Sequence, residues 1–308
     1  MRMVFMGTPD YSVATLEELH RAGHEIVGVF AQPDKPVGRK RILTAPPVKE
    51  CAEKLGIKVY QPATLRDGEA LEILKSLAPE IIVVVAYGKI LPKEILQLPK
   101  YGCVNGHASL LPKYRGASPI QWCIVCGEKQ TGVTVMQMDE GMDTGDIISQ
   151  AVVDIGEQET AEQLFDRLST VSAKLMAETL VSIENGTATR QKQPENGISY
   201  APILKKEMAE LDFNKNATEL YNAVRGYYSW PCAFFFLEGK RVKVIKSAVA
   251  AESHATAGTV IRSDEKLIIA CGEGTALELC EIQPEGSRQM TATEWLRGKK
   301  IAVGTVIG

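Results

Sequence analysis

A run of six apolar residues, Ile81 to Ala86 (IIVVVA), limits the possible folds of this chain more than any other stretch. A strand with one face in solvent alternates apolar and polar residues, whereas an unbroken run is typical of a central parallel strand covered on both faces. Shorter apolar runs at Met3–Met6 and Ile26–Phe30 precede it, and stretches with helical spacing lie at 48–55 and 70–77. This alternation predicts a doubly wound, mostly parallel α/β sheet.

The length of 308 residues favours two domains. A long amphipathic helix is expected over Thr160–Glu184, and the polar stretch that follows it is the best linker. We therefore expect one domain over 1–188, a linker over 189–206 and a second domain over 207–308. Short strands separated by glycine-containing turns indicate that the second domain is a small β-barrel.

Composition narrows the cellular setting. No apolar run approaches the roughly 18 residues of a membrane span, and Gly7 interrupts the short apolar start, unlike a signal peptide. The seven cysteines fit a reducing compartment. Cys123 and Cys126 form a CxxC pair, but no second pair follows at zinc spacing. We expect a cytoplasmic protein without a metal site or membrane contact.

Residues with chemically functional side chains are most closely spaced at 105–119, NGHASLLPKYRGASP. Asn105 and His107 are two residues apart, so an extended backbone would project both from one face. The prolines and glycine that follow indicate a shaped loop after a strand, and such loops often carry sites. Gly106 would let a ligand approach the backbone, although it is also compatible with an ordinary turn. This setting favours a functional role for His107 over a merely packed histidine.

A second segment, Met138 to Asp146 (MDEGMDTGD), supplies carboxylates. Together an Asn, a His and an Asp can orient a substrate, stabilise an oxyanion and accept a proton. Aspartates also gather in turns for structural reasons, and three carboxylates can bind a metal, although the calcium-loop pattern is missing. We expect one catalytic carboxylate with structural neighbours among Asp139, Asp143 and Asp146, and the pattern does not say which.

Positive charge gathers in both domains. The segment Lys35–Arg41 (KPVGRKR) places four positive charges in a loop expected near the ligand-binding edge of the sheet, which suits a substrate that carries phosphate. In the second domain Arg241 and Lys243 share one face of an alternating strand. Charge runs are often no more than solvated surface, but these two groups together favour a polyanionic partner despite the net charge of −3.

These segments resemble the folate-dependent formyltransferases. The stretches NGHASLLPKYRGASPIQW and GVTVMQMDEGMDTGD are similar to the active-site signature of that family, and GTPDYSV, QPDKPVGRKR, VVVAYGKILP and RGYYSWPCA extend the resemblance over nearly the whole chain. The resemblance implies a Rossmann-like formyltransferase domain followed by an oligonucleotide-binding-type (OB-like) barrel. One departure is Gly106, where the family usually carries a larger apolar residue.

The resemblance also implies a reaction. The formyl donor would be 10-formyltetrahydrofolate, and the acceptor would be the α-amino group of methionine esterified to initiator tRNA, in translation initiation. Asn105, His107 and Asp143 would form the catalytic set. The folate would contact Ser109, Leu110, Leu111 and Pro112, and the backbone near Tyr87 and Gly88. The tRNA would contact Lys35, Arg39, Lys40, Arg41, Arg241 and Lys243.

Two other functions are compatible with the sequence. The first domain would also serve a formyltransferase for a small amine, such as glycinamide ribonucleotide or a nucleotide-linked amino sugar, but the basic loop and the appended barrel favour tRNA. A non-catalytic RNA-binding protein on the same scaffold is the other alternative, and the intact Asn-His-Asp set counts against it. We expect the protein to act as a monomer.

Overall fold

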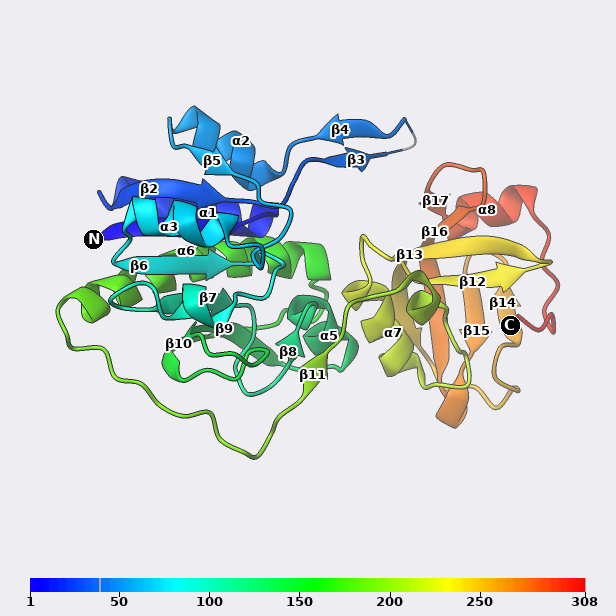
Figure 1. Ribbon diagram of the computed structural model, residues 1–308. Coiled ribbons are helices and arrows are strands. Elements are labelled where there is room, and N and C mark those ends of the chain that lie inside the picture. Colours follow the sequence, from blue (N-terminus) through cyan, green and yellow to red (C-terminus); the bar gives the residue numbers. More distant parts are fainter. Residues whose placement is uncertain (39, 308) are drawn as a thin grey trace. The chain divides into compact units, whose positions relative to one another are not determined.

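The computed structural model describes residues 1–38 and 40–307, which fall into two compact units (Figure 1). The first unit comprises residues 1–119, 130–154 and 165–201. The second comprises residues 120–129, 155–164 and 202–308. The second unit thus takes two short segments, 120–129 and 155–164, from the range 1–188 that the sequence suggested as one continuous domain.

The first unit is built on a seven-stranded sheet. Its order is β10 (Ile147–Asp154), β9 (Gln130–Gln137), β7 (Cys103–His107), β6 (Ile81–Val85), β1 (Arg2–Gly7), β2 (Glu25–Phe30) and β5 (Val59–Tyr60). Neighbouring strands from β7 to β5 are parallel, and β9 and β10 add antiparallel pairs. Every residue of β6 is buried, as its unbroken apolar run predicts. The mostly parallel sheet is confirmed.

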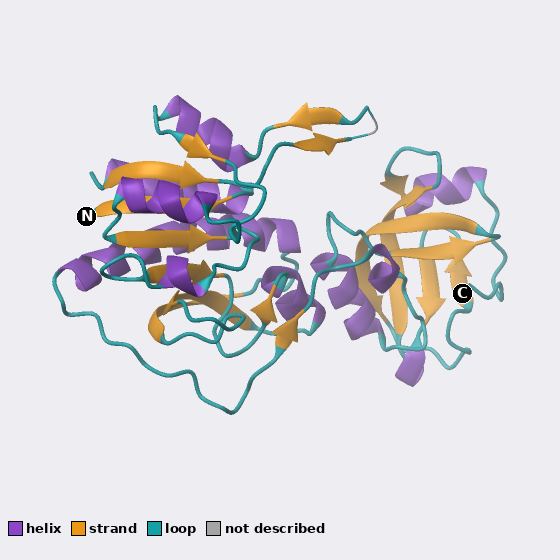
Figure 2. Ribbon diagram, viewed as in Figure 1, coloured by secondary structure: helices purple, strands orange, loops and turns teal. Residues whose placement is uncertain are grey.

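Helices alternate with these strands (Figure 2). They are α1 (Asp10–Arg21), α2 (Pro47–Lys54), α3 (Glu69–Leu77), α4 (Lys93–Leu96) and α6 (Ala161–Glu184). Helix α5 (Pro119–Val125) also lies between strands of this sheet along the chain, but from residue 120 onward it belongs to the second unit. In α6 the buried side chains Leu164, Leu168 and Leu180 recur at helical spacing, which gives this long helix one apolar face. None of the helices in residues 1–38 and 40–307 has both the length and the apolarity needed to cross a membrane.

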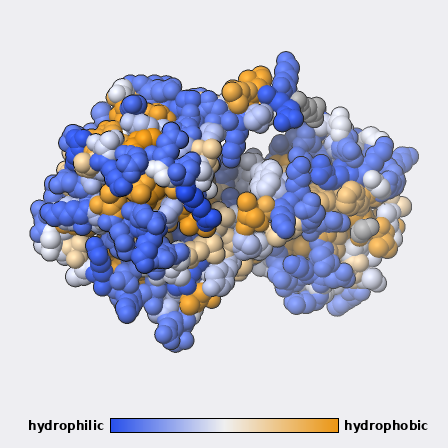
Figure 3. Space-filling view, in the orientation of Figure 1, coloured by the Kyte–Doolittle hydropathy of each residue, from blue (hydrophilic) through white to orange (hydrophobic). Residues whose placement is uncertain are grey.

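The basic segment forms a small hairpin rather than a loop. Strand β3 (Lys35–Val37) pairs antiparallel with β4 (Ile42–Thr44), and every residue of both strands is exposed. Figure 3 shows hydrophobic residues on this hairpin beside hydrophilic ones. The exposed hydrophobic residues of the hairpin are Val37, Ile42 and Leu43. Arg39, a predicted tRNA contact, lies outside the described residues. The remaining short pair of the first unit joins β8 (Arg115–Gly116) to β11 (Tyr200–Ala201).

The second unit contains an antiparallel sheet in the order β12 (Phe234–Leu237), β13 (Lys240–Ala250), β16 (Ala276–Pro284), β15 (Leu267–Ala270) and β14 (Val260–Ser263), with β17 (Met290–Thr291) paired to β16. Helices α7 (Ala217–Gly226) and α8 (Ala292–Gly298), and short 3-10 turns at Lys206–Ala209 and Gly272–Gly274, accompany it. Val242 and Val244 are buried while Arg241 is exposed, so the alternation predicted for this strand is confirmed.

Candidate active site

Asn105 and His107 lie on the last residues of strand β7, at the carboxyl edge of the parallel strands. The sequence placed them in a loop after a strand, and the structure corrects this because β7 pairs with β6 on one side and β9 on the other up to its end. Their spacing of two still puts both on one face. Strands β1, β2 and β6 end at this same edge, where ligands of such sheets usually bind.

The His107 ring has a polar neighbour at each nitrogen. It is 6% exposed, and its Nε2 atom lies 2.9 Å from the main-chain oxygen of Tyr114. Since a carbonyl oxygen can only accept, Nε2 carries a proton and donates it there. The other nitrogen, Nδ1, lies 3.7 Å from Oδ2 of Asp143. Nδ1 is therefore the nitrogen at which a proton can be exchanged with Asp143 or a substrate.

The three aspartates of the acidic segment have different environments. The Oδ2 atom of Asp143, which faces His107, accepts a 2.8 Å hydrogen bond from the main-chain N–H of Gly116. Asp139 instead closes the turn, because its Oδ1 atom accepts from the Gly141 N–H and the Thr144 hydroxyl. Of the three aspartates, Asp143 is thus the one whose carboxylate approaches His107.

Asn105 offers an amide that no described residue of the chain binds. Its side chain is half-buried and makes no hydrogen bond to residues 1–38 or 40–307. Gly106 beside it is buried under helix α6, where an added Cβ would lie 3.1 Å from Oγ of Ser172 and 3.4 Å from Cε of Met176. The amide beside His107 therefore has its hydrogen-bonding groups available for a ligand.

The loop after β7 is closed by buried hydroxyl groups. Ser109 is fully buried and donates to the main-chain oxygen of Lys113 at 2.6 Å. The Thr134 hydroxyl donates to the Ser109 oxygen at 2.7 Å and accepts from the Leu111 N–H at 3.1 Å. Among the predicted folate contacts in this loop, Leu110 and Pro112 keep part of their surface exposed, whereas Ser109 and Leu111 are buried.

The predicted contacts Tyr87 and Gly88 follow strand β6 at the same edge. The main-chain oxygen of Tyr87 accepts from the Thr8 hydroxyl at 3.0 Å and from Nε2 of Gln32 at 3.1 Å, and Gln32 also reaches the Gly88 oxygen at 3.2 Å. The Tyr87 ring is buried, and burial raises the pKa of its phenol to about 12. Sequence reasoning missed Thr8 and Gln32, although they are the first residue after β1 and the second residue after β2, and both strands end at this edge.

A further residue at the site, Gln193, comes from the segment expected to be a linker. Its Nε2 atom donates to the main-chain oxygens of Asp143 and Gly145, both at 2.8 Å. Its Oε1 atom accepts from the guanidinium of the buried Arg115, at 2.7 Å from Nη2 and 3.2 Å from Nε. A glutamine within a polar stretch carries no periodicity or motif that would single it out from the sequence.

The predicted tRNA contacts divide between the units. Lys35, Lys40 and Arg41 belong to the exposed hairpin of the first unit. Arg241 and Lys243 lie on β13 of the second, where the Arg241 guanidinium is 5.4 Å from the centre of the Phe234 ring. Both groups present positive charge at the surface of their own unit.

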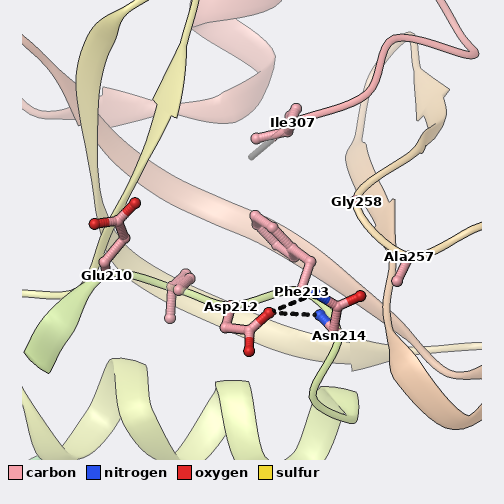
Figure 4. A pocket seen from close by; sticks show the side chains of 8 residues that line it. Glu210, Asp212, Phe213, Asn214, Ala257, Gly258 and Ile307 are labelled. Carbon is pink, nitrogen blue, oxygen red and sulfur yellow. Dashed lines mark hydrogen bonds between the residues drawn. The ribbon is translucent and has the colours of Figure 1, made fainter.

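The second unit also contains a cavity of about 380 Å³ (Figure 4). Glu210 and Asp212 are among its lining residues, and Asp212 accepts hydrogen bonds from the main-chain and side-chain nitrogens of Asn214. An acidic lining does not suit a polyanion, and we place the candidate site in the first unit.

Within residues 1–38 and 40–307, no group of three or more His, Cys, Asp or Glu side chains is arranged to hold a metal ion.

Known proteins resemble this chain over its whole length. The formyl transferase family model matches residues 1–180, and the model of the formyl transferase C-terminal domain matches residues 203–300. A methionyl-tRNA formyltransferase of Thermodesulfovibrio yellowstonii is 48% identical over 303 residues, which cover 98% of this chain and 97% of the relative. One from Caldanaerobacter subterraneus is 46% identical and covers 100% of both chains.

Solved structures show the same fold at low sequence identity. The N-formyltransferase of Helicobacter canadensis, solved with folinic acid and dTDP-3-aminofucose, has a TM-score of 0.69 at 22% identity and covers 92% of this chain and 99% of its own. A methionyl-tRNA formyltransferase from Clostridium thermocellum has a TM-score of 0.55 at 20% identity and covers 81% and 94%. With both family models matched and close relatives that span its full length, the chain belongs to the formyl transferase family.

Proposed function

We propose that this protein transfers the formyl group of 10-formyltetrahydrofolate to the α-amino group of methionine on initiator tRNA, giving formylmethionyl-tRNA for translation initiation. The main support for the proposal is that Asn105 and His107 lie at the carboxyl edge of the sheet with Asp143 next to His107. The chain is also 46–48% identical over its full length to proteins named methionyl-tRNA formyltransferase. A small-amine acceptor is the second candidate, because the Helicobacter structure was solved with an amino sugar nucleotide.

The reaction begins with attack of the amine on the formyl carbon. An α-amino group has an ordinary pKa of about 7.7–8.0, so a minority of the acceptor is neutral and nucleophilic near pH 7. Attack forms a new C–N bond and turns the formyl oxygen into an oxyanion. The free amide of Asn105 and a proton on the His107 ring are the donors beside this position, and one such donor contributes about 2.7–4 kcal/mol to the transition state.

Collapse of the intermediate breaks the C–N bond to the folate nitrogen. The attacking amine must lose a proton, and the departing folate nitrogen must gain one. We assign this transfer to the His107–Asp143 pair, because Nδ1 faces the carboxylate at 3.7 Å while Nε2 is held by Tyr114. General acid–base catalysis of this kind contributes roughly 10²–10⁴-fold. The step needs no covalent enzyme intermediate.

Substrate binding is assigned by charge and position. The folate would lie along the loop after β7, against Leu110 and Pro112, and near the chain at Tyr87 and Gly88. The tRNA acceptor end would meet the basic hairpin of the first unit, and the tRNA body would meet the Arg241 face of the C-terminal domain, since clustered lysines and arginines bind phosphates. We further propose that the protein works in the cytoplasm as a monomer.

The test is a formyl-transfer assay with parallel acceptors. We expect transfer from 10-formyltetrahydrofolate to methionyl-tRNA, and none to free methionine, glycinamide ribonucleotide or nucleotide-linked amino sugars. Transfer to one of the small amines alone would keep the catalytic assignment and replace the acceptor. No transfer to any acceptor, together with salt-sensitive RNA binding, would contradict the enzymatic proposal.

A further inference from the structure

Residues 191–201, here called the return segment, form the last part of the connection that follows α6 and end in β11, all within the first unit (Figure 1). Main-chain hydrogen bonds of 2.7 and 2.8 Å join Gln191 to Ile147 near its start. Near its end Ser199 accepts the Arg115 N–H with its main-chain oxygen and the Tyr114 N–H with its hydroxyl, both at 2.9 Å. The segment is therefore hydrogen-bonded to the first unit near both ends.

The Gln193 side chain uses its full hydrogen-bonding capacity between these anchors. Its two amide hydrogens go to the oxygens of Asp143 and Gly145, and its oxygen accepts twice from Arg115. The orientation of the amide is fixed by its partners, since carbonyl oxygens only accept and a guanidinium only donates. Gln193 thus joins the acidic segment to the loop that follows β7.

Asp143 depends on this connection at two points. Its backbone has φ = +55°, a left-handed conformation that non-glycine residues adopt uncommonly. The hydrogen bond from Gln193 to the main-chain oxygen of Asp143 therefore helps to hold this conformation. Its carboxylate is held by the Gly116 N–H, and Gly116 belongs to β8, which pairs with β11 at the end of the return segment. Both the backbone and the carboxylate of Asp143 are therefore positioned by residues that the return segment contacts.

We propose that Gln193 is a positioning residue for Asp143, and that the return segment is a working part of the catalytic centre rather than a passive linker. Gln193 acts through Asp143 on the distance between the carboxylate and the His107 ring. A displacement of about 1 Å at a catalytic group can cost on the order of 10²-fold in rate. The kinetic arm of the test rests on the proposed formyl transfer, and a second arm does not.

The informative substitution is Gln193→Glu. It preserves the length and shape of the side chain and keeps an oxygen for Arg115, but it replaces both donors with an oxygen that faces two carbonyls. Gln191→Glu is the matched control, because it makes the same change of charge two residues away on an exposed side chain whose residue bonds Ile147 through the main chain alone. Gln193→Asn is an uncharged second variant whose amide is one methylene too short.

In the kinetic arm we expect Gln193→Glu and Gln193→Asn to lower kcat by about 10- to 100-fold, with the KM of both substrates within about twofold of wild type. Gln191→Glu should keep the wild-type kcat. Unchanged kcat in both Gln193 variants, or an equal loss in the control, overturns the proposal. A wild-type protein that fails to formylate methionyl-tRNA would instead count against the proposed function, and this arm would then use whichever acceptor is active.

The second arm measures the NMR resonances of the His107 ring and does not require turnover. The chain has four histidines, so the imidazole ¹⁵N resonances of His107 can be assigned by their loss in His107→Gln. We expect these resonances to move in the Gln193 variants and to stay in place in Gln191→Glu, because only the former displace Asp143 from the ring. Unmoved His107 resonances in a folded Gln193 variant overturn the proposal whatever the acceptor proves to be.

Discussion

The Nδ1 atom of His107 lies 3.7 Å from the Oδ2 atom of Asp143, which is close enough for charge interaction and slightly long for a direct hydrogen bond. The opposite ring nitrogen is already committed to a main-chain carbonyl. In the proposed mechanism the proton is therefore handled at Nδ1, and the carboxylate can orient the ring or receive the proton. On this proposal Asp143 has a chemical role that the other aspartates of its segment do not share.

Asp143→Asn should lower kcat by roughly 10²–10⁴-fold and leave the fold intact. Asparagine has the same size and keeps an oxygen for the Gly116 N–H, but it removes the charge that faces His107. Single-turnover formyl transfer measures the loss, and circular dichroism checks the fold. Asp139→Asn is the control with near wild-type activity, since its amide oxygen can still close the turn through Gly141 and Thr144. Near wild-type turnover of Asp143→Asn would contradict its catalytic assignment.

Asn105→Asp should separate activity from stability. It is nearly isosteric, but it removes the amide donor and places negative charge where the oxyanion forms, so kcat should fall by at least 10²–10³-fold. The thermal midpoint should change little, because the Asn105 amide bonds no residue in the described part of the chain. Steady-state kinetics and a thermal melt test the two halves. A large drop in the thermal midpoint would show that Asn105 is mainly structural.

The sheet could be predicted because its central strands are buried on both faces and consist of apolar runs, as β6 demonstrates. The hairpin β3–β4 carries no such signal, because all of its residues are exposed. Strand β10 was missed for a related reason, since its residues are only partly buried or exposed. Burial creates the pattern that a sequence reveals, and exposed strands therefore escape it.

The candidate site was predictable in its residue types but not in its geometry. Asn105 and His107 stand in a polar, glycine-containing stretch, and only pairing with β6 and β9 makes it a strand. The choice of Asp143 over Asp139 rests on which carboxylate approaches His107, a distance that no spacing along the chain determines. Gln193 was missed because its role is set by contacts with segments far away in the sequence.

Gly106→Val should destabilise the protein by about 1–3 kcal/mol, whereas Gly106→Ala should change stability by less than about 1 kcal/mol. The backbone at Gly106 is an ordinary strand, so alanine adds no backbone strain, and its Cβ would meet Ser172 and Met176 at 3.1 and 3.4 Å. Valine adds two more methyl groups against the buried face of α6. Urea unfolding of both variants measures the difference, and a valine variant as stable as wild type would show that α6 yields readily.

Arg225→Ala should cost about 2–3 kcal/mol of stability. The buried guanidinium donates to the main-chain oxygens of Gly156 and Glu159 and to the Asn222 side chain, and burial lowers the pKa of this arginine. It thereby joins α7 to the segment 155–164 within the second unit. Chemical unfolding should show the loss, and Arg297→Ala, an exposed arginine on α8, should stay within about 0.5 kcal/mol of wild type. Equal effects of the two substitutions would contradict this role.

Neutralising lysines of the basic hairpin should weaken tRNA binding and leave the rate of the catalytic step unchanged. Lys35 and Lys40 lie on the hairpin, outside the Asn105–His107–Asp143 set. In Lys35→Gln/Lys40→Gln we expect a higher KM for methionyl-tRNA, an unchanged KM for the folate donor and an unchanged kcat at saturating tRNA. Each lost phosphate contact should also reduce the slope of log affinity against log salt by about 0.7–0.9. Lys174→Gln, which removes a charge of the same kind from the exposed face of α6, is the control. A tRNA affinity and salt slope equal to those of the control would place the tRNA contact elsewhere on the molecule.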